Sequence, residues 1–264
     1  MPDGVIFARP AVMFYILRSL KNGASRGKLY EFIARNQAGE ADRSCGESEK
    51  MSKQLFMFDL DGTLINSVGG IANSVNVTRQ QYGFPPLPVP TITGFTGDGA
   101  VKLLERSFAD VTLPVPVPEA VAAMVKNYEN DPVRDTYLYD GVAETLRTMK
   151  EKGVLLAVVS NKPESVGTRI LAELGVADLF CENIGGGRFP LKPAPDAFLH
   201  VMRKYGAAPE DCWIVGDNHT DIHAAAAIPV RSVFCRYGFG VLADATPTAE
   251  IDSFAELLKF LRDA

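Results

Sequence analysis

The sequence predicts an α/β fold: a Rossmann-like, doubly wound parallel sheet that carries an inserted α-helical subdomain. From residue 51 onward, short apolar runs alternate with segments whose apolar residues recur three and four positions apart. This alternation is typical of a parallel sheet covered by helices on both faces. About ninety residues separate the first two expected strands, far more than one crossover helix requires. Charged and hydroxyl side chains follow several of the strands, as they do at ligand sites of open α/β sheets.

The expected strands are short apolar runs that end in polar residues. The run Val-Leu-Leu-Ala-Val-Val-Ser shows no alternation, which favours a strand buried on both faces. The full set covers residues 55–59, 154–160, 181–184, 212–216 and 230–235.

The segments between these strands have helical periodicity. Gly153, Gly175 and Gly206 follow three of them and supply a C-terminal stop. The expected core helices cover residues 141–152, 163–174, 194–205, 220–227 and 253–262.

The long stretch between the first two strands predicts an inserted helical subdomain at residues 66–138, called the insertion below. Proline-rich connectors separate its helical segments. Those segments cover residues 70–82, 99–108 and 119–130. The sheet-containing core is then made of residues 51–65 and 139–264.

Residues 1–50 differ from the rest of the chain. Eight basic and six acidic side chains give them a charge of +2, so the remaining 214 residues carry −7. Their apolar stretch is interrupted by Arg9, Pro10 and Arg18, and it lacks the basic start and the cleavage site of a secretory signal. We expect a poorly ordered extension, with Met51 as a second plausible start. An organelle targeting segment is the alternative.

Composition narrows the partners and the compartment. The chain has 27 Lys and Arg against 32 Asp and Glu, and this net charge of −5 argues against a nucleic-acid-binding surface. We find no apolar run of the ~20 residues that a membrane span needs. Cys45, Cys181, Cys212 and Cys235 show no paired spacing, which favours a reducing compartment. We therefore expect a cytoplasmic monomer or homodimer with no nucleic-acid or membrane partner.

Polar residues gather where the predicted strands end. Because the carboxyl ends of parallel strands meet at one edge of a sheet, we expect these side chains to converge. They are Asp59, Asp61 and Thr63 after the first strand, Ser160, Asn161 and Lys162 after the second, Lys192 after the third, and Asp217 and Asp221 after the fourth.

The residue types at this edge indicate phosphoryl transfer. Three carboxylates, those of Asp59, Asp61 and Asp217, are unfavourable in one site unless a cation neutralises them. Without a His or Cys cluster, Mg²⁺ fits better than Zn²⁺. Lys192, Ser160 and the backbone amides after Asp61 supply donors for a phosphoryl group. One carboxylate can attack phosphorus while another handles the proton, and Asp59 and Asp61 are the natural pair.

The motifs at these strand ends, in order over residues 54–262, resemble those of haloacid dehalogenase superfamily phosphatases. The resemblance implies that Asp59 is the nucleophile and a Mg²⁺ ligand. Asp61 would be the general acid and then the base, and would give the metal its backbone carbonyl. Ser160 and Lys192 resemble the phosphate-holding residues of the second and third motifs.

The fourth motif completes the implied metal site. Asp217 resembles its metal carboxylate, and Asp221 resembles the residue that orients Lys192 or the water shell of the metal. The insertion resembles the mobile cap of the family, which closes over the substrate and excludes water.

Flanking segments are similar to those of phosphoglycolate phosphatases. They are residues 97–99, 103–106, 139–142, 158–163 and 237–238. The similarity implies hydrolysis of a small phosphorylated metabolite, 2-phosphoglycolate, to glycolate and phosphate. The candidate substrate-binding residues are Thr63, Asn161, Lys162 and Arg106, with Lys102 and Arg134 as further cations of the insertion.

Other functions stay open at this point. A related phosphatase could act on a sugar phosphate, a nucleotide or pyrophosphate. A β-phosphoglucomutase-like phosphotransferase is disfavoured by Thr63, where such enzymes often carry Val. A non-catalytic phosphate binder would have lost a motif, and none is lost. His219 and His223 stand four residues apart but lack a third metal ligand nearby, so we expect surface or supporting roles for them.

Overall fold

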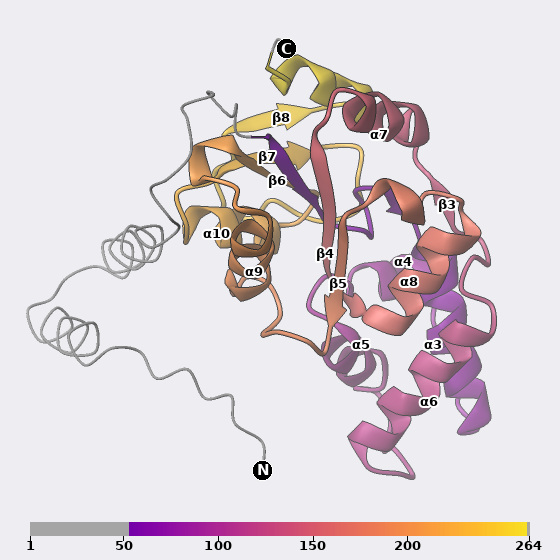
Figure 1. Ribbon diagram of the computed structural model, residues 1–264. Coiled ribbons are helices and arrows are strands. Elements are labelled where there is room, and N and C mark those ends of the chain that lie inside the picture. Colours follow the sequence, from indigo (N-terminus) through magenta and orange to yellow (C-terminus); the bar gives the residue numbers. More distant parts are fainter. Residues whose placement is uncertain (1–52, 263–264) are drawn as a thin grey trace, which may run out of the picture. The chain divides into compact units, whose positions relative to one another are not determined.

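The computed structural model describes residues 53–262, so the extension expected at residues 1–50 lies outside it. Six parallel strands form one sheet in the order β5-β4-β1-β6-β7-β8 (Figure 1). The strands are β1 Leu55–Phe58, β4 Leu155–Pro163, β5 Glu182–Gly186, β6 Cys212–Gly216, β7 Arg231–Cys235 and β8 Ala249–Ile251. Counted along the chain, this is the 3-2-1-4-5-6 order of the doubly wound fold, and the predicted fold class is confirmed.

Helices cover both faces of the sheet because the side chains of β1 alternate between two cores. Phe56 and Phe58 pack in the core beneath the first group of helices, whereas Leu55 and Met57 pack in the core beneath the second. All four side chains are fully buried. The first group comprises α7 Val142–Glu151, α8 Glu164–Glu173 and the 3₁₀ helix η4 Phe254–Phe260, and the second comprises α9 Asp196–Tyr205 and α10 His219–Ala226.

Two elements of the core differ from the prediction. Residues 253–262 were expected to form an α-helix, but the segment is the 3₁₀ helix η4. The edge strand β8 was not expected, because its three residues include the exposed Glu250 and give no apolar run. Short 3₁₀ turns, η2 Ala177–Leu179 and η3 Pro209–Asp211, complete the core. Among the described residues, no helix is both long enough and apolar enough to cross a membrane.

The insertion contains four helices, and a two-stranded antiparallel hairpin flanks it (Figure 1). The hairpin pairs β2 Ile65–Asn66 with β3 Tyr137–Leu138. The helices are α3 Val68–Gln81, α4 Val89–Thr93, α5 Ala100–Ser107 and α6 Val117–Asn130. The short α4 was not predicted, because its sequence is proline-rich. Proline is tolerated in the first turn of a helix, where its missing N–H has no intrahelical partner.

A buried arginine ties the insertion together. Arg79 of α3 has no exposed surface. Its guanidinium donates to the carbonyl oxygens of Pro85, at 2.7 Å, and of Ser107, and it pairs with Asp110 at 2.8 Å. It also lies 5.3 Å from the ring centroid of Phe108. One side chain thus connects α3 to the two segments that follow α3 and α5.

Candidate active site

The site lies where the strand order reverses, at the carboxyl ends of β1, β4 and β6. Phe58 of β1 is in register with Val158 of β4 and Val215 of β6. Asp59 directly follows β1, and its N–H donates to the carbonyl of Val215 at 2.8 Å. Asp217 directly follows β6. Crevices at such switch points are where open α/β sheets bind ligands.

Asp59 is held by two donors on the same oxygen. Its Oδ1 accepts from the N–H of Leu60 at 2.7 Å and lies 2.8 Å from Nζ of Lys192. The same ammonium group donates to Oδ1 of Asp221 at 2.7 Å. Burial alone would lower the pKa of Lys192, but the charges of Asp221 and Asp59 more than offset this effect and raise it. Lys192 is therefore a cation that fixes two carboxylates.

Asp217 is held by a glycine-containing loop. Its Oδ2 accepts from the backbone N–H groups of Phe239 at 3.0 Å and Gly240 at 2.7 Å. Burial, together with the nearby charges of Asp59 and Asp221, raises the pKa of Asp217 well above its ordinary value. Two amide donors do not cancel the cost of burying this charge beside two others.

Two glycines allow the close approach of Asp217. Gly62 has φ +80°, and a Cβ built there would lie 1.9 Å from Oδ2 of Asp217. A Cβ on Gly238 would lie 2.3 Å from Cβ of the same aspartate. Larger residues at these positions would displace the carboxylate.

The carboxylates of the site fit a hard divalent cation. Asp59, Asp217 and Asp221 are all buried, and one oxygen from each lies within 4.8 Å of the others. Burial raises the pKa of Asp221 to about 7, although Lys192 opposes the shift. With Asp61, four carboxylates face two lysines, Lys192 and Lys162. The excess of two negative charges and the oxygen-only donors suit Mg²⁺.

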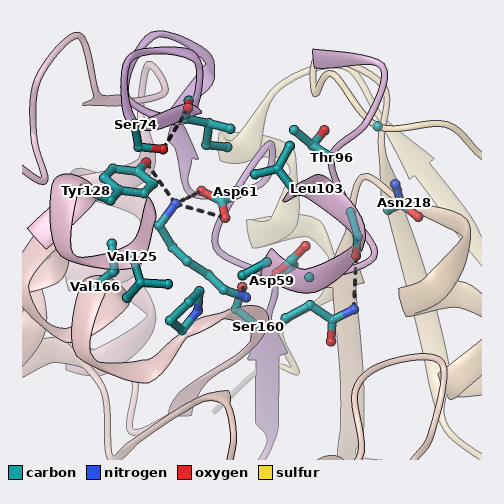
Figure 2. A pocket seen from close by; sticks show the side chains of 18 of the residues that line it. Asp59, Asp61, Ser74, Thr96, Leu103, Val125, Tyr128, Ser160, Val166 and Asn218 are labelled. Carbon is teal, nitrogen blue, oxygen red and sulfur yellow. Dashed lines mark hydrogen bonds and ion pairs between the residues drawn. The ribbon is translucent and has the colours of Figure 1, made fainter. Parts of the chain in front are cut away.

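Asp61 faces away from this carboxylate cluster. Its Oδ1 accepts from the hydroxyl of Ser67, which precedes α3, and from Nζ of Lys162 at 2.8 Å. Lys162 also donates to the hydroxyl oxygen of Tyr128, on α6, at 2.9 Å. Figure 2 shows Tyr128 and Asp61 on either side of these contacts. Asp61 of the core is thus connected to the insertion through one ammonium group.

A cavity of about 80 Å³ lies over these residues, between the core and the insertion. The described polar residues that line it on the core side are Asp59, Asp61, Ser160, Asn161, Lys162, Asp217 and Asn218. The insertion contributes mainly apolar side chains, including Leu103 and Val125 (Figure 2). Ligand pockets of this composition fix the orientation of a ligand by a few polar groups.

Asn161 connects the cavity to two loops. Its Nδ2 donates to the carbonyl of Gly97 in the insertion at 3.0 Å and to the carbonyl of Lys192 at 3.1 Å, and its Oδ1 accepts from the N–H of Lys192 at 2.8 Å. The hydroxyl oxygen of the neighbouring Ser160 accepts from the N–H of Lys162 at 3.2 Å. Asn161 therefore has a structural role in addition to lining the cavity.

Four residues that the sequence nominated for substrate binding do not line the cavity. Thr63 is fully buried, and its hydroxyl has no hydrogen-bond partner among the described residues. Arg106 instead pairs with Asp98 at 2.6 Å. Lys102 and Arg134 form ion pairs with acidic residues three positions away and are exposed. The partners of Lys102 and Arg134 are at i,i+3 spacing, which the sequence alone could suggest, whereas the pairing of Arg106 with Asp98 depends on how the loop before α5 folds.

Several residues of the site could not be singled out from the sequence. Tyr128 lies in a helix with ordinary amphipathic spacing, and Ser67 is one of many hydroxyl residues. The amides of Phe239 and Gly240 act through the backbone, which carries no residue-type signal. Gly238 and Gly240 are the residue-type signal by which a close approach of the backbone here could be suspected. His219 and His223 lie 5.8 Å apart, ring centroid to centroid, and His223 contacts Asp244 at 3.2 Å.

Comparisons with known proteins agree with the class that the fold and the carboxylate site define, a hydrolase built on a doubly wound sheet. Residues 56–235 match the family model of haloacid dehalogenase-like hydrolases. The chain is 35% identical over 213 residues to phosphoglycolate phosphatase 1 of Pseudomonas aeruginosa, covering 78% of each protein. It is 34% identical to a phosphoglycolate phosphatase of Haemophilus influenzae, covering 79% of this chain and 98% of the relative.

Solved structures give the same result. A crystal structure described as a predicted phosphoglycolate phosphatase from Haemophilus somnus superposes with a TM-score of 0.74 at 32% identity, covering 80% of this chain and 99% of the other. The chain belongs to the haloacid dehalogenase-like hydrolase family.

Proposed function

We propose that this chain is a Mg²⁺-dependent phosphatase that hydrolyses 2-phosphoglycolate to glycolate and phosphate. The observation that carries the proposal is the division of the site's carboxylates. Asp59 lies with Asp217 and Asp221 beside Lys192, whereas Asp61 faces Lys162 and the insertion. This division supports one carboxylate for the attack and the other for handling a proton. The names of the relatives from Pseudomonas aeruginosa and Haemophilus influenzae support the substrate.

Asp59, Asp217 and Asp221 would hold the metal, with the backbone carbonyl of Asp61 as a further ligand. Bound there, Mg²⁺ supplies positive charge that offsets the carboxylates and the phosphoryl oxygens. The buried oxygen donors of these residues support this assignment.

In the first half of the reaction, a carboxylate oxygen of Asp59 attacks phosphorus. The new bond from Asp59 to phosphorus forms as the ester bond from phosphorus to the glycolate oxygen breaks. The protonated carboxyl of Asp61 gives its proton to that departing oxygen, so glycolate leaves with a hydroxyl group.

In the second half, water attacks the phosphorus of the aspartyl-phosphate. The Asp61 carboxylate takes a proton from this water, the bond from Asp59 to phosphorus breaks, and phosphate leaves. Lys192 keeps Asp59 oriented through both halves. Lys192, Ser160 and the amides that follow Asp61 are our candidates for stabilising the phosphoryl oxygens.

The cavity supports a small substrate. Its volume of about 80 Å³ is well below the roughly 300 Å³ or more of sites for drug-sized ligands. We therefore favour 2-phosphoglycolate over a nucleotide as the substrate. We also propose that the insertion, residues 66–138, is a cap on the core, because its helices supply the wall of the cavity opposite Asp59.

The three described cysteines are free thiols, which supports a reducing compartment such as the cytoplasm.

A phosphate-release assay tests the proposal. Wild type and Asp59→Asn are compared on 2-phosphoglycolate, sugar phosphates, nucleotides and pyrophosphate, with and without Mg²⁺. Asp178→Asn, an exposed Asp outside the cavity, is the matched control. We expect Mg²⁺-dependent release from 2-phosphoglycolate that is lost in Asp59→Asn only. Equal release by Asp59→Asn would overturn the mechanism, and faster turnover of another substrate would overturn the substrate assignment.

A further inference from the structure

The cavity has one cation on its lining among the described residues, Lys162. The side chain of Lys162 is buried, with 3% exposed. Burial by itself would lower the pKa of Lys162, but the charge of Asp61 and the contact with Tyr128 raise it. The group is therefore an ammonium, with three N–H donors.

The position of this ammonium matches the shape of 2-phosphoglycolate. Nζ lies 2.8 Å from Oδ1 and 3.2 Å from Oδ2 of Asp61, the residue proposed to protonate the leaving oxygen. In 2-phosphoglycolate, the carboxylate carbon is two bonds from that oxygen. A cation in contact with Asp61 is thus within reach of the substrate carboxylate. The longer contact, to Oδ2, is the one that a substrate carboxylate would replace.

Tyr128 determines where this ammonium lies. Its hydroxyl oxygen accepts from Nζ at 2.9 Å, and Nζ lies 4.2 Å from the centre of its ring. Thr136 is within hydrogen-bonding reach of the same hydroxyl. Without Tyr128, the ammonium group of Lys162 would keep only Asp61 as a hydrogen-bond partner among the described residues.

Among the described residues, Tyr128 is the cavity-lining hydroxyl residue of the insertion that contacts Lys162. The hydroxyls of Ser74 and Thr96 donate to carbonyl groups of their own segments, those of Ile71 at 2.8 Å and Thr93 at 2.7 Å, and make no hydrogen bond to Lys162. The side chain of Tyr128 extends to the lysine of the core (Figure 2).

We propose that Tyr128 is a specificity-determining positioning residue, which holds Lys162 so that the site selects phosphate esters carrying a carboxylate next to the ester carbon. The inference rests on the proposed function and adds the residue of the insertion that produces its selectivity. Since Tyr128 acts through Lys162, its loss should affect substrates with a carboxylate more than those without one.

The test compares Tyr128→Phe with wild type on 2-phosphoglycolate and on ethyl phosphate, in which a methyl group replaces the carboxylate. Where ethyl phosphate turns over too slowly, its inhibition constant against 2-phosphoglycolate is measured instead. We expect KM for 2-phosphoglycolate to rise about tenfold, as for a lost hydrogen bond to a charged group. Lys162 also contacts Asp61, so any effect on proton transfer is common to both substrates. The ratio of kcat/KM for 2-phosphoglycolate to that for ethyl phosphate should therefore fall about tenfold.

Tyr137→Phe is the matched control, because its ring is 57% exposed and lies outside the cavity. Thermal unfolding of each variant checks folding. An unchanged preference in Tyr128→Phe, or an equal loss on both substrates, overturns the inference and leaves the proposed function standing. If wild type itself does not prefer 2-phosphoglycolate to ethyl phosphate, the substrate assignment fails and the inference fails with it.

Discussion

The two buried lysines of the site have different partners. Lys192 contacts Asp59 and Asp221 in the core, and Lys162 contacts Asp61 and Tyr128 towards the insertion. Each ammonium group joins two elements that are distant in the sequence. The carboxylate that we propose for attack and the one that we propose for proton transfer therefore have separate electrostatic surroundings, as two groups with opposite tasks require.

The raised pKa of Asp221 predicts a pH dependence of stability in metal-free protein. The folded pKa is about 7, against an ordinary value of 3.8. Between these values the folded protein binds a proton that the unfolded chain has released, so the free energy of unfolding falls as pH rises from about 4 to about 7. Below that window the contribution no longer changes with pH.

Chemical denaturation in EDTA at several pH values measures this effect. Asp221→Asn removes the titrating group and should show a flatter dependence than wild type. The same slope in both proteins would contradict the assignment of the effect to Asp221.

Gly62 offers a second prediction at the residue scale. Alanine there meets both a positive φ and Oδ2 of Asp217 at 1.9 Å, whereas Gly153 has a similar φ of +77° with nothing within 4 Å. We expect Gly153→Ala to cost about 1–2 kcal/mol of unfolding free energy and to keep full activity. Gly62→Ala should cost more and lose most activity, because Asp217 must move.

Denaturant unfolding and the phosphate-release assay distinguish the two glycine variants. Retention of activity in Gly62→Ala would show that the position of Asp217 is not critical.

At the scale of elements, the sequence predicted the strands with long apolar runs and the helices with clear periodicity. β4 and β6 were found because they are buried on both faces. The hairpin of β2 and β3 was missed, since each strand has two residues and pairs with a segment about seventy positions away. Contacts between segments distant in the sequence also limited the prediction of the site. The residues that follow each strand were predictable, but the contact of Tyr128 with Lys162 depends on how α6 packs over the core.

The helices of the insertion depend on one buried polar side chain, that of Arg79. Arg79→Met removes the donor for the carbonyl oxygens of Pro85 and Ser107 and breaks the pair with Asp110. Leaving the buried carbonyl oxygen of Ser107 unpaired should lower the unfolding free energy by about 1–3 kcal/mol.

Asp110→Asn is the control for Arg79→Met, because Asp110 is half exposed and its loss leaves Arg79 bonded to both carbonyls. Its effect should be much smaller. Equal destabilisation of the two variants in denaturant titrations would mean that the ion pair, rather than the carbonyl contacts, holds the insertion.

At the scale of the molecule, part of the net charge of −5 is concentrated at the site. Four carboxylates and two lysines meet at one edge of the sheet, and three of the carboxylates are buried within one cluster. Mutual repulsion in this cluster opposes folding when no cation is bound. If the site binds a divalent ion as we propose, the same repulsion favours binding of the ion and lowers the stability of the metal-free protein.

We expect Asp217→Asn to raise the thermal stability of the metal-free protein and to reduce its stabilisation by Mg²⁺. In EDTA, the amide removes one of three repelling charges while its oxygen can still accept from Phe239 and Gly240. The variant should unfold at a higher temperature than wild type. At Mg²⁺ concentrations about a hundredfold above Kd, wild type should gain about 2.7 kcal/mol, or roughly 5–10 °C in Tm, and the variant much less. Differential scanning calorimetry measures both effects, with Asp178→Asn as the control that keeps the response of wild type. An equal Mg²⁺ response in Asp217→Asn would place the metal elsewhere.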